Sequence, residues 1–422
     1  MQPMDLWPAP HRTSAFSASV ALPGSKSLTN RALVLSALAD GPSMLIRPLV
    51  SRDTELMAAA LESLGAKVEQ DGDHWRVTPL TVGAGITTHI DCGLAGTVMR
   101  FVPPIAALLN GAVTFDGDER ARSRPMNVTI DSLRALGINI QGDNSLPFTV
   151  HGTGEVSGEE LTIDASNSSQ FVSALLLAAP RFTNGIKLHH RGERLPSTPH
   201  IEMTLECLNQ RGVKTSASGN DWSVSPGPIE AKVVSIEPDL SNAGVFIGAA
   251  LVVGGTVRIQ HWPSQTTQAG DRWREIAFRF GASVKLDNSD LVIEADGKPK
   301  AVQLDLGDVG ELTPVVAAVA AFADAPSELS NIAHLRGHET DRLAALEEQI
   351  EALGGEVEQT ETGLRIIPRA MHASTLQTYA DHRMAHSAAI LGLGVPGTQV
   401  ENIATTAKTY PDFAKDWEVF VS

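Results

Sequence analysis

The stretch "PGSKSLTNRALVLSALADG", Pro23–Gly41, contains the pattern on which the predicted fold rests. It begins with small and polar residues, among them Lys26 and Arg31, continues as an apolar run and ends at Gly41. Ser, Thr and Asn often begin helices, and Gly often ends them. Because the run between them is apolar nearly all round, it predicts a buried helix rather than an amphipathic surface helix.

The same order of features recurs six times along the chain. Each polar cluster precedes an apolar run rich in Ala, Leu and Val, such as "FVPPIAALLNG" or "VVAAVAAFADA". The clusters are spaced 70, 73, 73, 69 and 71 residues apart, as measured between the markers Lys26, Gly96, Ser169, Asn242, Glu311 and His382. A regular period of this kind indicates a repeated structural unit.

A second feature alternates with the first. Five segments each predict a helix that ends at a glycine, followed by a strand, a turn and another strand. Their glycines are Gly65, Gly137, Gly212, Gly281 and Gly354. A sixth copy is missing after the last polar cluster, so we expect the N-terminal stretch to complete the last unit.

These repeats predict an α/β protein with two similar domains of three units each. We expect domain 1 to contain residues 1–22 and 237–422, and therefore both termini. Domain 2 then contains residues 23–236. We place the crossings near Pro23 and Ile236, because Pro238 and Asp239 interrupt the repeated pattern at the midpoint of the chain.

Composition excludes several classes of protein. The net charge of −16 over 422 residues argues against nucleic-acid binding, which needs a basic surface. Cys92 and Cys207 are too few for a disulfide scaffold or a structural zinc site, and the His residues show no metal-ligand spacing. No apolar run reaches about 18 residues, and the N-terminus lacks a signal-peptide core, so we expect a cytoplasmic protein without membrane spans.

The polar clusters also suggest a function. The first N–H groups of a helix lack internal partners and lie at the positive end of the helix dipole, so they attract anions. A single cluster is equally well explained as an ordinary N-cap, which is what we expect for Asn242. Lys26 and Arg31 favour anion binding, because a cap needs no long basic side chain.

Seven motifs carry a resemblance to a known family. In chain order they are "PGSKSLTNRA", "LAGTVMRF", "SRPM", "DASNSSQFVSALLLAAP", "GHETDRL", "YADHRMA" and "TAKTYPDF". Together they span the whole chain and resemble the 5-enolpyruvylshikimate-3-phosphate synthases, which are enolpyruvyl transferases. The resemblance implies two inside-out α/β barrel domains, each built from three βαβαββ units. It also implies a two-stranded hinge and an active site in the cleft between the domains.

The resemblance further implies a reaction. The enolpyruvyl group of phosphoenolpyruvate is transferred to the 5-hydroxyl of shikimate 3-phosphate, and phosphate leaves after a tetrahedral intermediate. This is the sixth step of the shikimate pathway. The implied protein is a monomer without cofactor or metal. Glyphosate is a candidate inhibitor, and the sequence leaves open whether this chain is sensitive to it.

Site residues follow from the resemblance, motif by motif. The catalytic residues it implies are Glu311, Glu339, Lys26 and His382. The residues implied to bind shikimate 3-phosphate are Lys26, Ser27, Arg31, Ser168, Ser169, Gln170, Ser197, Glu311 and His338. Those implied to bind phosphoenolpyruvate are Lys26, Gly96, Arg124, Gln170, Arg342, Arg383 and Lys408.

The two acidic residues divide the proton transfers in this interpretation. Glu311 would accept the proton of the 5-hydroxyl, and Glu339 would donate a proton to C3 of phosphoenolpyruvate. The division of labour between Glu311, Glu339 and Lys26 stays open. For Glu339 the competing interpretation is a helix N-terminal Glu that the dipole favours. We also expect Arg342 to share a face with His338, provided that the stretch between them is helical.

This chain departs from the usual family pattern at several positions. Glu311 stands where Asp is usual, His338 where Lys is common, and His200 where many members have Tyr. Leu94 and Phe101 stand where Asn and Pro are often found.

Arg100, Ser168 and Ser169 each allow two interpretations. Arg100 either shapes the phosphoenolpyruvate site or forms a structural ion pair. Ser168 and Ser169 either cradle a phosphate or cap a helix.

Two alternative functions remain at this point. One is an enolpyruvyl transferase acting on UDP-N-acetylglucosamine, although many such enzymes carry a reactive Cys in the loop that here reads "DGDERARSRPM". The other is a non-catalytic anion-binding repeat protein. It would keep the polar helix starts but would not need Glu311 together with Glu339.

Overall fold

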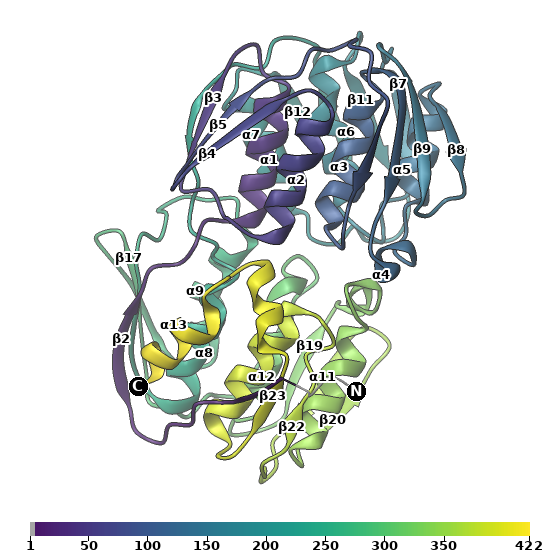
Figure 1. The fold of residues 1–422 in the computed structure, drawn as a ribbon. Helices are drawn as coiled ribbons and strands as arrows, with labels where there is room; N and C mark the ends of the chain where they lie inside the picture. Colours follow the sequence, from purple (N-terminus) through teal and green to yellow (C-terminus); the bar gives the residue numbers. More distant parts are fainter. Residues whose placement is uncertain (1–4) are drawn as a thin grey trace. The chain divides into compact units, whose positions relative to one another are not determined.

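The computed structural model describes residues 5–422. Their contacts divide them into two compact units, and the chain crosses from one to the other twice. Unit 1 comprises Met1–Pro23 and Pro238–Ser422, and unit 2 comprises Gly24–Glu237. Figure 1 shows the elements of each unit.

Unit 2 contains three sheets of four strands, in the orders β14-β3-β5-β4, β6-β7-β9-β8 and β10-β11-β13-β12. In each sheet the first two strands are parallel and the remaining neighbours antiparallel. The strands are β3 (Ser43–Ile46), β4 (Lys67–Asp71), β5 (His74–Thr78), β6 (Thr88–Asp91), β7 (Asn110–Asp116), β8 (Asn139–Gly142), β9 (Phe148–Thr153), β10 (Glu160–Ile163), β11 (Ile186–His190), β12 (Thr215–Ser218), β13 (Asp221–Val224) and β14 (Val233–Ser235). The helices are α1 (Lys26–Ala37), α2 (Arg52–Ser63), α3 (Gly96–Ala106), α4 (Glu119–Arg122), α5 (Asn127–Ala135), α6 (Gln170–Ala178), η1 (Ala179–Arg181) and α7 (Pro199–Asn209).

The described part of unit 1 contains sheets in the orders β16-β17-β15-β2, β18-β19-β21-β20 and β1-β23-β22. The strands are β1 (Leu6–Pro8), β2 (Phe16–Val20), β15 (Gly255–Ile259), β16 (Ser283–Asp287), β17 (Asp290–Ala295), β18 (Gln303–Asp305), β19 (Ser327–Ser330), β20 (Glu356–Gln359), β21 (Leu364–Ile367), β22 (Thr375–Leu376) and β23 (Gln399–Glu401). The helices are α8 (Ala243–Val253), η2 (Ala269–Arg272), α9 (Trp273–Arg279), η3 (Gly310–Leu312), α10 (Thr313–Ala320), η4 (Ala333–Gly337), α11 (Arg342–Ala352), α12 (His382–Gly394), η5 (Ile403–Lys408) and α13 (Phe413–Val421).

Strands distant in sequence complete three of these sheets. β2 pairs in parallel with β15, and β14 pairs in parallel with β3. β1 pairs antiparallel with β23, so the N-terminal stretch supplies the third strand of the last sheet. The predicted α/β class is confirmed, and the six small mixed sheets are consistent with repeated βαβαββ units.

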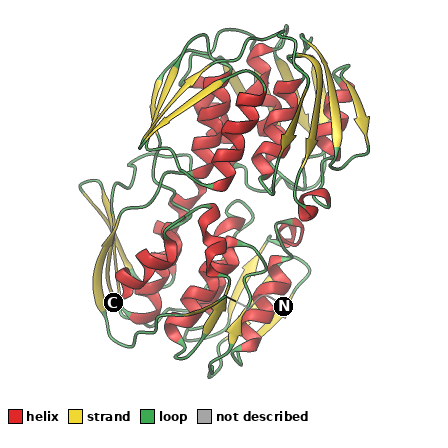
Figure 2. Cartoon of the chain, in the orientation of Figure 1, coloured by secondary structure: helices red, strands yellow, loops and turns green. Residues whose placement is uncertain are grey.

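Three buried helices form the centre of each unit. α1, α3 and α6 contact one another in unit 2, and α8, α10 and α12 do so in unit 1. Within each unit the strands flank the helices on the outside (Figure 2). A helix that is apolar all round must be buried on every side, and each surrounding sheet packs one of its faces against the helices. In β5, for example, burial alternates along the strand: Trp75 and Val77 are buried, whereas His74 and Arg76 are exposed.

The predicted starts of the buried helices agree with the structure, although α1 ends at Ala37, before Gly41. All six polar clusters lie at the starts of the buried helices, with Glu311 in the 3-10 turn directly before α10. The five predicted helix-ending glycines follow α2, α5, α7, α9 and α11 and have φ values between 77° and 101°. This left-handed conformation is readily adopted by glycine and suits the residue after a helix. Among the described residues, no helix combines the length and apolar character needed to cross a lipid bilayer.

An aromatic cluster joins the last helix to the centre of unit 1. The ring of Phe246 on α8 lies 4.7 Å from that of Phe420 and 5.8 Å from that of Trp417, both on α13. Tyr410 and Phe413 complete the cluster. Aromatic pairs at these separations add to the stabilisation that burial provides.

We predict that Phe246→Ala lowers the free energy of unfolding of unit 1 by about 3–5 kcal/mol, because it opens a cavity among these rings. Urea denaturation followed by tryptophan fluorescence measures this loss. Val419→Ala, on the same helix but with 71% of its side chain exposed, is the control. It should change the free energy by no more than about 0.5 kcal/mol. Equal losses in the two variants would contradict the role assigned to the cluster.

Candidate active site

The start of α1 places Lys26 beside a carboxylate. Ser25 is the N-cap, and its Oγ accepts a hydrogen bond from the N–H of Leu28. Lys26 is the first helical residue, and its Nζ lies 3.3 Å from Oδ2 of Asp53 on α2. Both side chains are mostly buried. Sequence reasoning missed Asp53, which offsets the unfavourable position of a cation at a helix N-terminus.

The start of α3 brings two arginines against the backbone. A Cβ atom at Gly96 would lie 2.9 Å from an Nη of Arg124 and 3.2 Å from Nη1 of Arg100. Two guanidinium groups therefore approach Gly96 closely. Arg124 Nη1 also donates to the carbonyl of Leu94 over 3.1 Å. A larger residue at position 96 would have to displace one or both arginines.

The start of α6 carries the Ser-Ser-Gln sequence. Ser168 Oγ accepts a hydrogen bond from the N–H of Gln170, so this hydroxyl acts as a cap. Ser169 is the N-cap residue by position, but its buried side chain makes no capping bond. Gln170 is the first helical residue, and its Oε1 accepts from Arg100 Nη1 over 2.7 Å.

Arg31 is buried, with 2% of its surface exposed, and its guanidinium is held from several sides. It donates to the carbonyls of Ser27 and His200 and to the hydroxyl of Thr204. Its guanidinium lies over the ring of Phe101 at 5.4 Å. The departure from the usual Pro at position 101 thus supplies an aromatic face for a cation.

Ser197 lies in the loop before α7 with a φ of 54°, which is uncommon for a residue other than glycine. Its carbonyl accepts a hydrogen bond from the N–H of His200, and His200 in turn binds Arg31 through its own carbonyl. The fold therefore links Ser197, His200 and Arg31 through short contacts within unit 2.

In unit 1 the central interaction joins α11 to α12. Arg342 Nε and Nη2 donate to the two oxygens of Asp381 over 2.8 and 3.1 Å, and both side chains are buried. Burial alone would lower the pKa of Arg342, but Asp381, with further contributions from Glu339 and Glu311, holds that pKa above its ordinary value. Glu339 and Glu311 therefore lie close enough to Arg342 to help raise its pKa.

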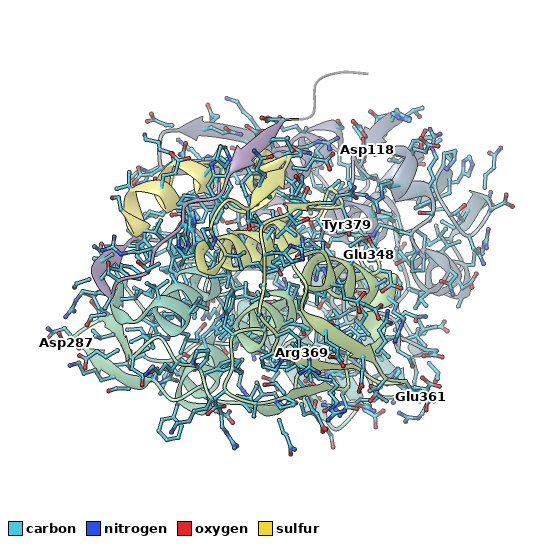
Figure 3. All side chains as sticks on the ribbon, turned by 90° about the horizontal axis from the view of Figure 1, so that it is seen from below. Asp118, Asp287, Glu348, Glu361, Arg369 and Tyr379 are labelled. Carbon is cyan, nitrogen blue, oxygen red and sulfur yellow. The ribbon has the colours of Figure 1, made fainter. Side chains whose placement is uncertain are left out.

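Asp381 was missed by sequence reasoning, although its place directly before "HRM" at a helix start was a signal. It is the N-cap of α12, and its Oδ1 accepts from the N–H of Arg383 over 2.8 Å. Tyr379 and Ala380 before it both have a φ of 54°, so a left-handed turn brings the chain into this cap. Tyr379 Oη donates to Glu348 on α11, and the two side chains are labelled in Figure 3.

Glu339 lies between two potential proton partners. Its Oε1 accepts from Lys408 Nζ over 2.6 Å, and its Oε2 lies 3.3 Å from Nδ1 of His382. The helix-dipole interpretation of Glu339 is wrong, because α11 begins only at Arg342 and Asp341 is its cap. The carboxylate is placed instead by the two basic side chains.

A metal ion has one geometrically suitable position among the described residues. Glu339, Asp381 and His382 each offer a ligand atom, and these atoms lie within 4.8 Å of one another. However, Lys408 and Arg342 already bind the two carboxylates. The charge of this group is therefore balanced by protein cations.

Glu311 is held by a hydroxyl in the neighbouring helix start. Ser241 Oγ donates to Glu311 Oε1 over 2.5 Å. The next residue, Asn242, was expected to be only a cap, and this is wrong. Its side chain makes no capping bond. Instead its Oδ1 accepts from Nη1 of Arg383 and from Thr409.

His338 contacts Arg342, as expected, but for a different reason. Arg342 Nη1 lies 3.3 Å from Nδ1 of His338. The stretch between them is not helical, since η4 ends at Gly337 and α11 begins at Arg342. The bend between the two elements, rather than one helix face, brings the side chains together.

The fold and site can now be compared with known proteins. A profile described as EPSP synthase (3-phosphoshikimate 1-carboxyvinyltransferase) matches residues 10–417. The chain belongs to the EPSP synthase family. A 3-phosphoshikimate 1-carboxyvinyltransferase from Kocuria rhizophila is 54% identical over 430 residues, covering 99% of this chain and 97% of the relative. The protein is a transferase with EPSP synthase activity, and it acts in the shikimate pathway.

Solved EPSP synthase structures share the fold. An EPSP synthase from Acinetobacter baumannii matches with a TM-score of 0.83 at 20% identity, with 98% of each chain covered. The enolpyruvyl transferase NikO from Streptomyces tendae matches with a TM-score of 0.75 at 17% identity, covering 99% of this chain and 98% of its own. The predicted family and reaction class are confirmed. The family match favours EPSP synthase over the alternative that uses UDP-N-acetylglucosamine.

The predicted site residues form two sets, one in each unit, and most lie at or near helix starts. The set in unit 2 is Lys26, Ser27, Arg31, Gly96, Arg124, Ser168, Ser169, Gln170 and Ser197. The set in unit 1 is Glu311, His338, Glu339, Arg342, His382, Arg383 and Lys408. Within each set, hydrogen bonds or short contacts connect several of the members. Their individual roles toward EPSP synthase substrates stay predictions.

We predict that Asp381→Asn lowers the free energy of unfolding by about 3–5 kcal/mol, because it leaves Arg342 buried without its carboxylate. Urea denaturation measures the change. Glu358→Gln removes the exposed ion pair with Arg365 and serves as control, with an expected change of at most about 1 kcal/mol. A small effect of Asp381→Asn would show that the buried pair does not hold α11 and α12 together.

Proposed function

We propose that both residue sets act on the same two substrates, shikimate 3-phosphate and phosphoenolpyruvate. The observation that carries this proposal is the concentration of charged side chains at the buried helix starts of both units. Six cations lie among the predicted site residues: Lys26, Arg31, Arg124, Arg342, Arg383 and Lys408. Lys26, Arg342 and Lys408 also pair with protein carboxylates. Two phosphates and two carboxylates carry about five to six negative charges, and such a cluster of cations would attract them.

The reaction proceeds by addition and elimination. The 5-hydroxyl oxygen bonds to C2 of phosphoenolpyruvate, its proton passes to Glu311, and C3 gains a proton from Glu339. In the resulting tetrahedral intermediate C3 is a methyl group. The C2–O bond to phosphate then breaks, C3 returns a proton, and the enol ether and inorganic phosphate are released.

The contacts of Glu339 suit a group that donates and regains a proton. When Glu339 is ionised, Lys408 and His382 stabilise its charge. When it is protonated, Lys408 loses that partner and becomes available to the substrate phosphate. His382 Nδ1, at 3.3 Å, would hold the carboxylate in position while C3 returns the proton to it.

The contacts of Glu311 suit a proton acceptor. Ser241 donates to Oε1 of Glu311, which holds the carboxylate in position to accept a proton from the 5-hydroxyl of shikimate. The neighbouring Arg342 stabilises the ionised form that a base requires. The extra methylene of Glu, compared with the usual Asp, is accommodated in a 3-10 turn rather than inside a regular helix.

We predict that Glu311→Gln lowers phosphate release by about 10²–10⁴-fold while shikimate 3-phosphate still binds. A phosphate-release assay, with each substrate omitted in turn, measures turnover, and calorimetry measures binding. Glu328→Gln, at an exposed position of β19, should leave both unchanged. If Glu311→Gln kept full turnover, Glu311 would not be the proton acceptor.

The same assay tests the remaining alternatives. A non-catalytic anion-binding protein would bind both substrates and release no phosphate. A transferase acting on UDP-N-acetylglucosamine would release phosphate only when that acceptor replaced shikimate 3-phosphate. We expect release only with shikimate 3-phosphate and phosphoenolpyruvate together.

We further infer that the two chain crossings form a two-stranded hinge between inside-out α/β barrels. Hydrogen bonds tie the crossing segments together on both sides: Ser25 N–H donates to the carbonyl of Glu237, and Asp239 N–H donates to that of Pro23, each over 2.8 Å. Small-angle scattering tests the inference. Addition of shikimate 3-phosphate should lower the radius of gyration, and an unchanged radius would count against a hinge.

We also propose that this protein is a cytoplasmic monomer. The two cysteines are free thiols, and burial raises the pKa of Cys92 to about 12 and that of Cys207 to about 11. Such thiols are poor nucleophiles and poor partners for disulfide exchange. Light scattering should give the mass of a single chain, and a mass of two chains would contradict the monomer.

A further inference from the structure

Arg100 is a buried cation without a carboxylate partner. Only 4% of its surface is exposed, and its Nη1 donates to Gln170 Oε1 over 2.7 Å. Its Nη2 lies 3.5 Å from the carbonyl of Pro125, and its guanidinium lies over the ring of Phe171 at 5.0 Å. No carboxylate binds it among residues 5–422, so the structural ion pair that the sequence left open is not formed.

The bond between Arg100 and Gln170 fixes the direction of an amide. A guanidinium can only donate hydrogen bonds, so the atom of Gln170 that faces Arg100 must be the amide oxygen. The amide nitrogen therefore points away from Arg100. Within the described part of the chain it forms no hydrogen bond, and it is not among the buried polar atoms. Gln170 thus presents two N–H donors and no acceptor to a ligand.

Arg100 also adds to the positive charge around Gly96. Its guanidinium and that of Arg124 both approach within about 3 Å of one point, the position of a Cβ at residue 96. Burial, and then the charge of Arg124, lower the pKa of Arg100 well below its ordinary value. A lowered pKa is expected when two cations are held close together, and a bound anion would offset their repulsion.

We propose that Arg100 is a positioning residue that turns the amide N–H groups of Gln170 toward the anionic substrates. It contributes to binding of phosphoenolpyruvate through Gln170 and Arg124 without contacting the substrate itself. The proposal rests on the proposed function, because it takes phosphoenolpyruvate as the ligand of this cluster. It explains why a costly buried cation has no carboxylate beside it: a carboxylate would cancel the charge that attracts the substrate.

Gln170→Glu tests the direction of the amide. The new carboxylate keeps an oxygen for Arg100 and gains an ion pair, so the melting temperature should stay the same or rise. Its second oxygen replaces the N–H₂ group and faces the substrate. We expect the KM for phosphoenolpyruvate to rise at least about tenfold, because a charge-assisted hydrogen bond to the substrate is lost. An unchanged KM would overturn the proposal.

Arg100→Met and Arg100→Lys test the positioning residue itself. Arg100→Met should raise the KM for phosphoenolpyruvate about tenfold and raise that for shikimate 3-phosphate less. Arg100→Lys should recover part of this loss, because it keeps the charge and one donor but not the planar stacking on Phe171. If Arg100→Met fails to fold, Arg100→Lys and Gln170→Glu still give the measurement.

Arg211→Met is the matched control. Arg211 is also a buried arginine of unit 2, bound to the hydroxyls of Ser36 and Ser43 and to the carbonyl of Glu230. Its loss should lower the melting temperature but leave the ratio of the two KM values within about twofold. Equal changes of that ratio in Arg100→Met and Arg211→Met would show that Arg100 is only structural.

A double variant tests whether Arg100 acts on substrate binding through Gln170 or independently of it. In a Gln170→Leu background, Arg100→Met should change the KM for phosphoenolpyruvate by less than about threefold, because most of its effect is already lost. Fully additive effects would contradict action through Gln170. If the wild-type chain released no phosphate at all, the proposed function would fail instead, and this outcome is distinct from every result above.

Discussion

The burial of six helices that are apolar on every side is the constraint from which the rest of the structure follows. α1, α3 and α6 in one unit, and α8, α10 and α12 in the other, can be covered only by each other and by surrounding sheets. Their sides are therefore mostly packed against other apolar side chains. Their N-terminal ends remain, and every one of these ends carries polar or charged side chains.

Cations at helix N-termini are unfavourable by themselves, and the chain compensates for them in two ways. Asp53 binds Lys26 and Asp381 binds Arg342 at such positions, and Glu339 binds Lys408 at the end of η5. These pairs hold the cations in place. Around Gly96 no carboxylate binds Arg100 within the described residues. In the site that we propose, the anionic substrate would supply the compensating charge.

The departures of this chain from the usual family pattern have local structural consequences. Phe101 gives the buried Arg31 an aromatic face. His338 accepts from Arg342 in a position where a Lys would add another positive charge beside that arginine. Glu311 occupies a 3-10 turn and is held by Ser241. Each of these three residues therefore makes a specific contact with a neighbouring side chain.

Local features of the sequence determined the helix starts and the glycine helix ends, because caps, apolar runs and left-handed glycines act within a few residues. The sequence also determined the family, through motifs that span the chain. Only the tertiary structure decided which side chains meet. Lys26 and Asp53 are 27 residues apart, Arg342 and Asp381 39, Arg100 and Gln170 70, and Arg383 and Asn242 141. Pairings over such distances depend on how helices from different repeats pack, and no local pattern records that packing.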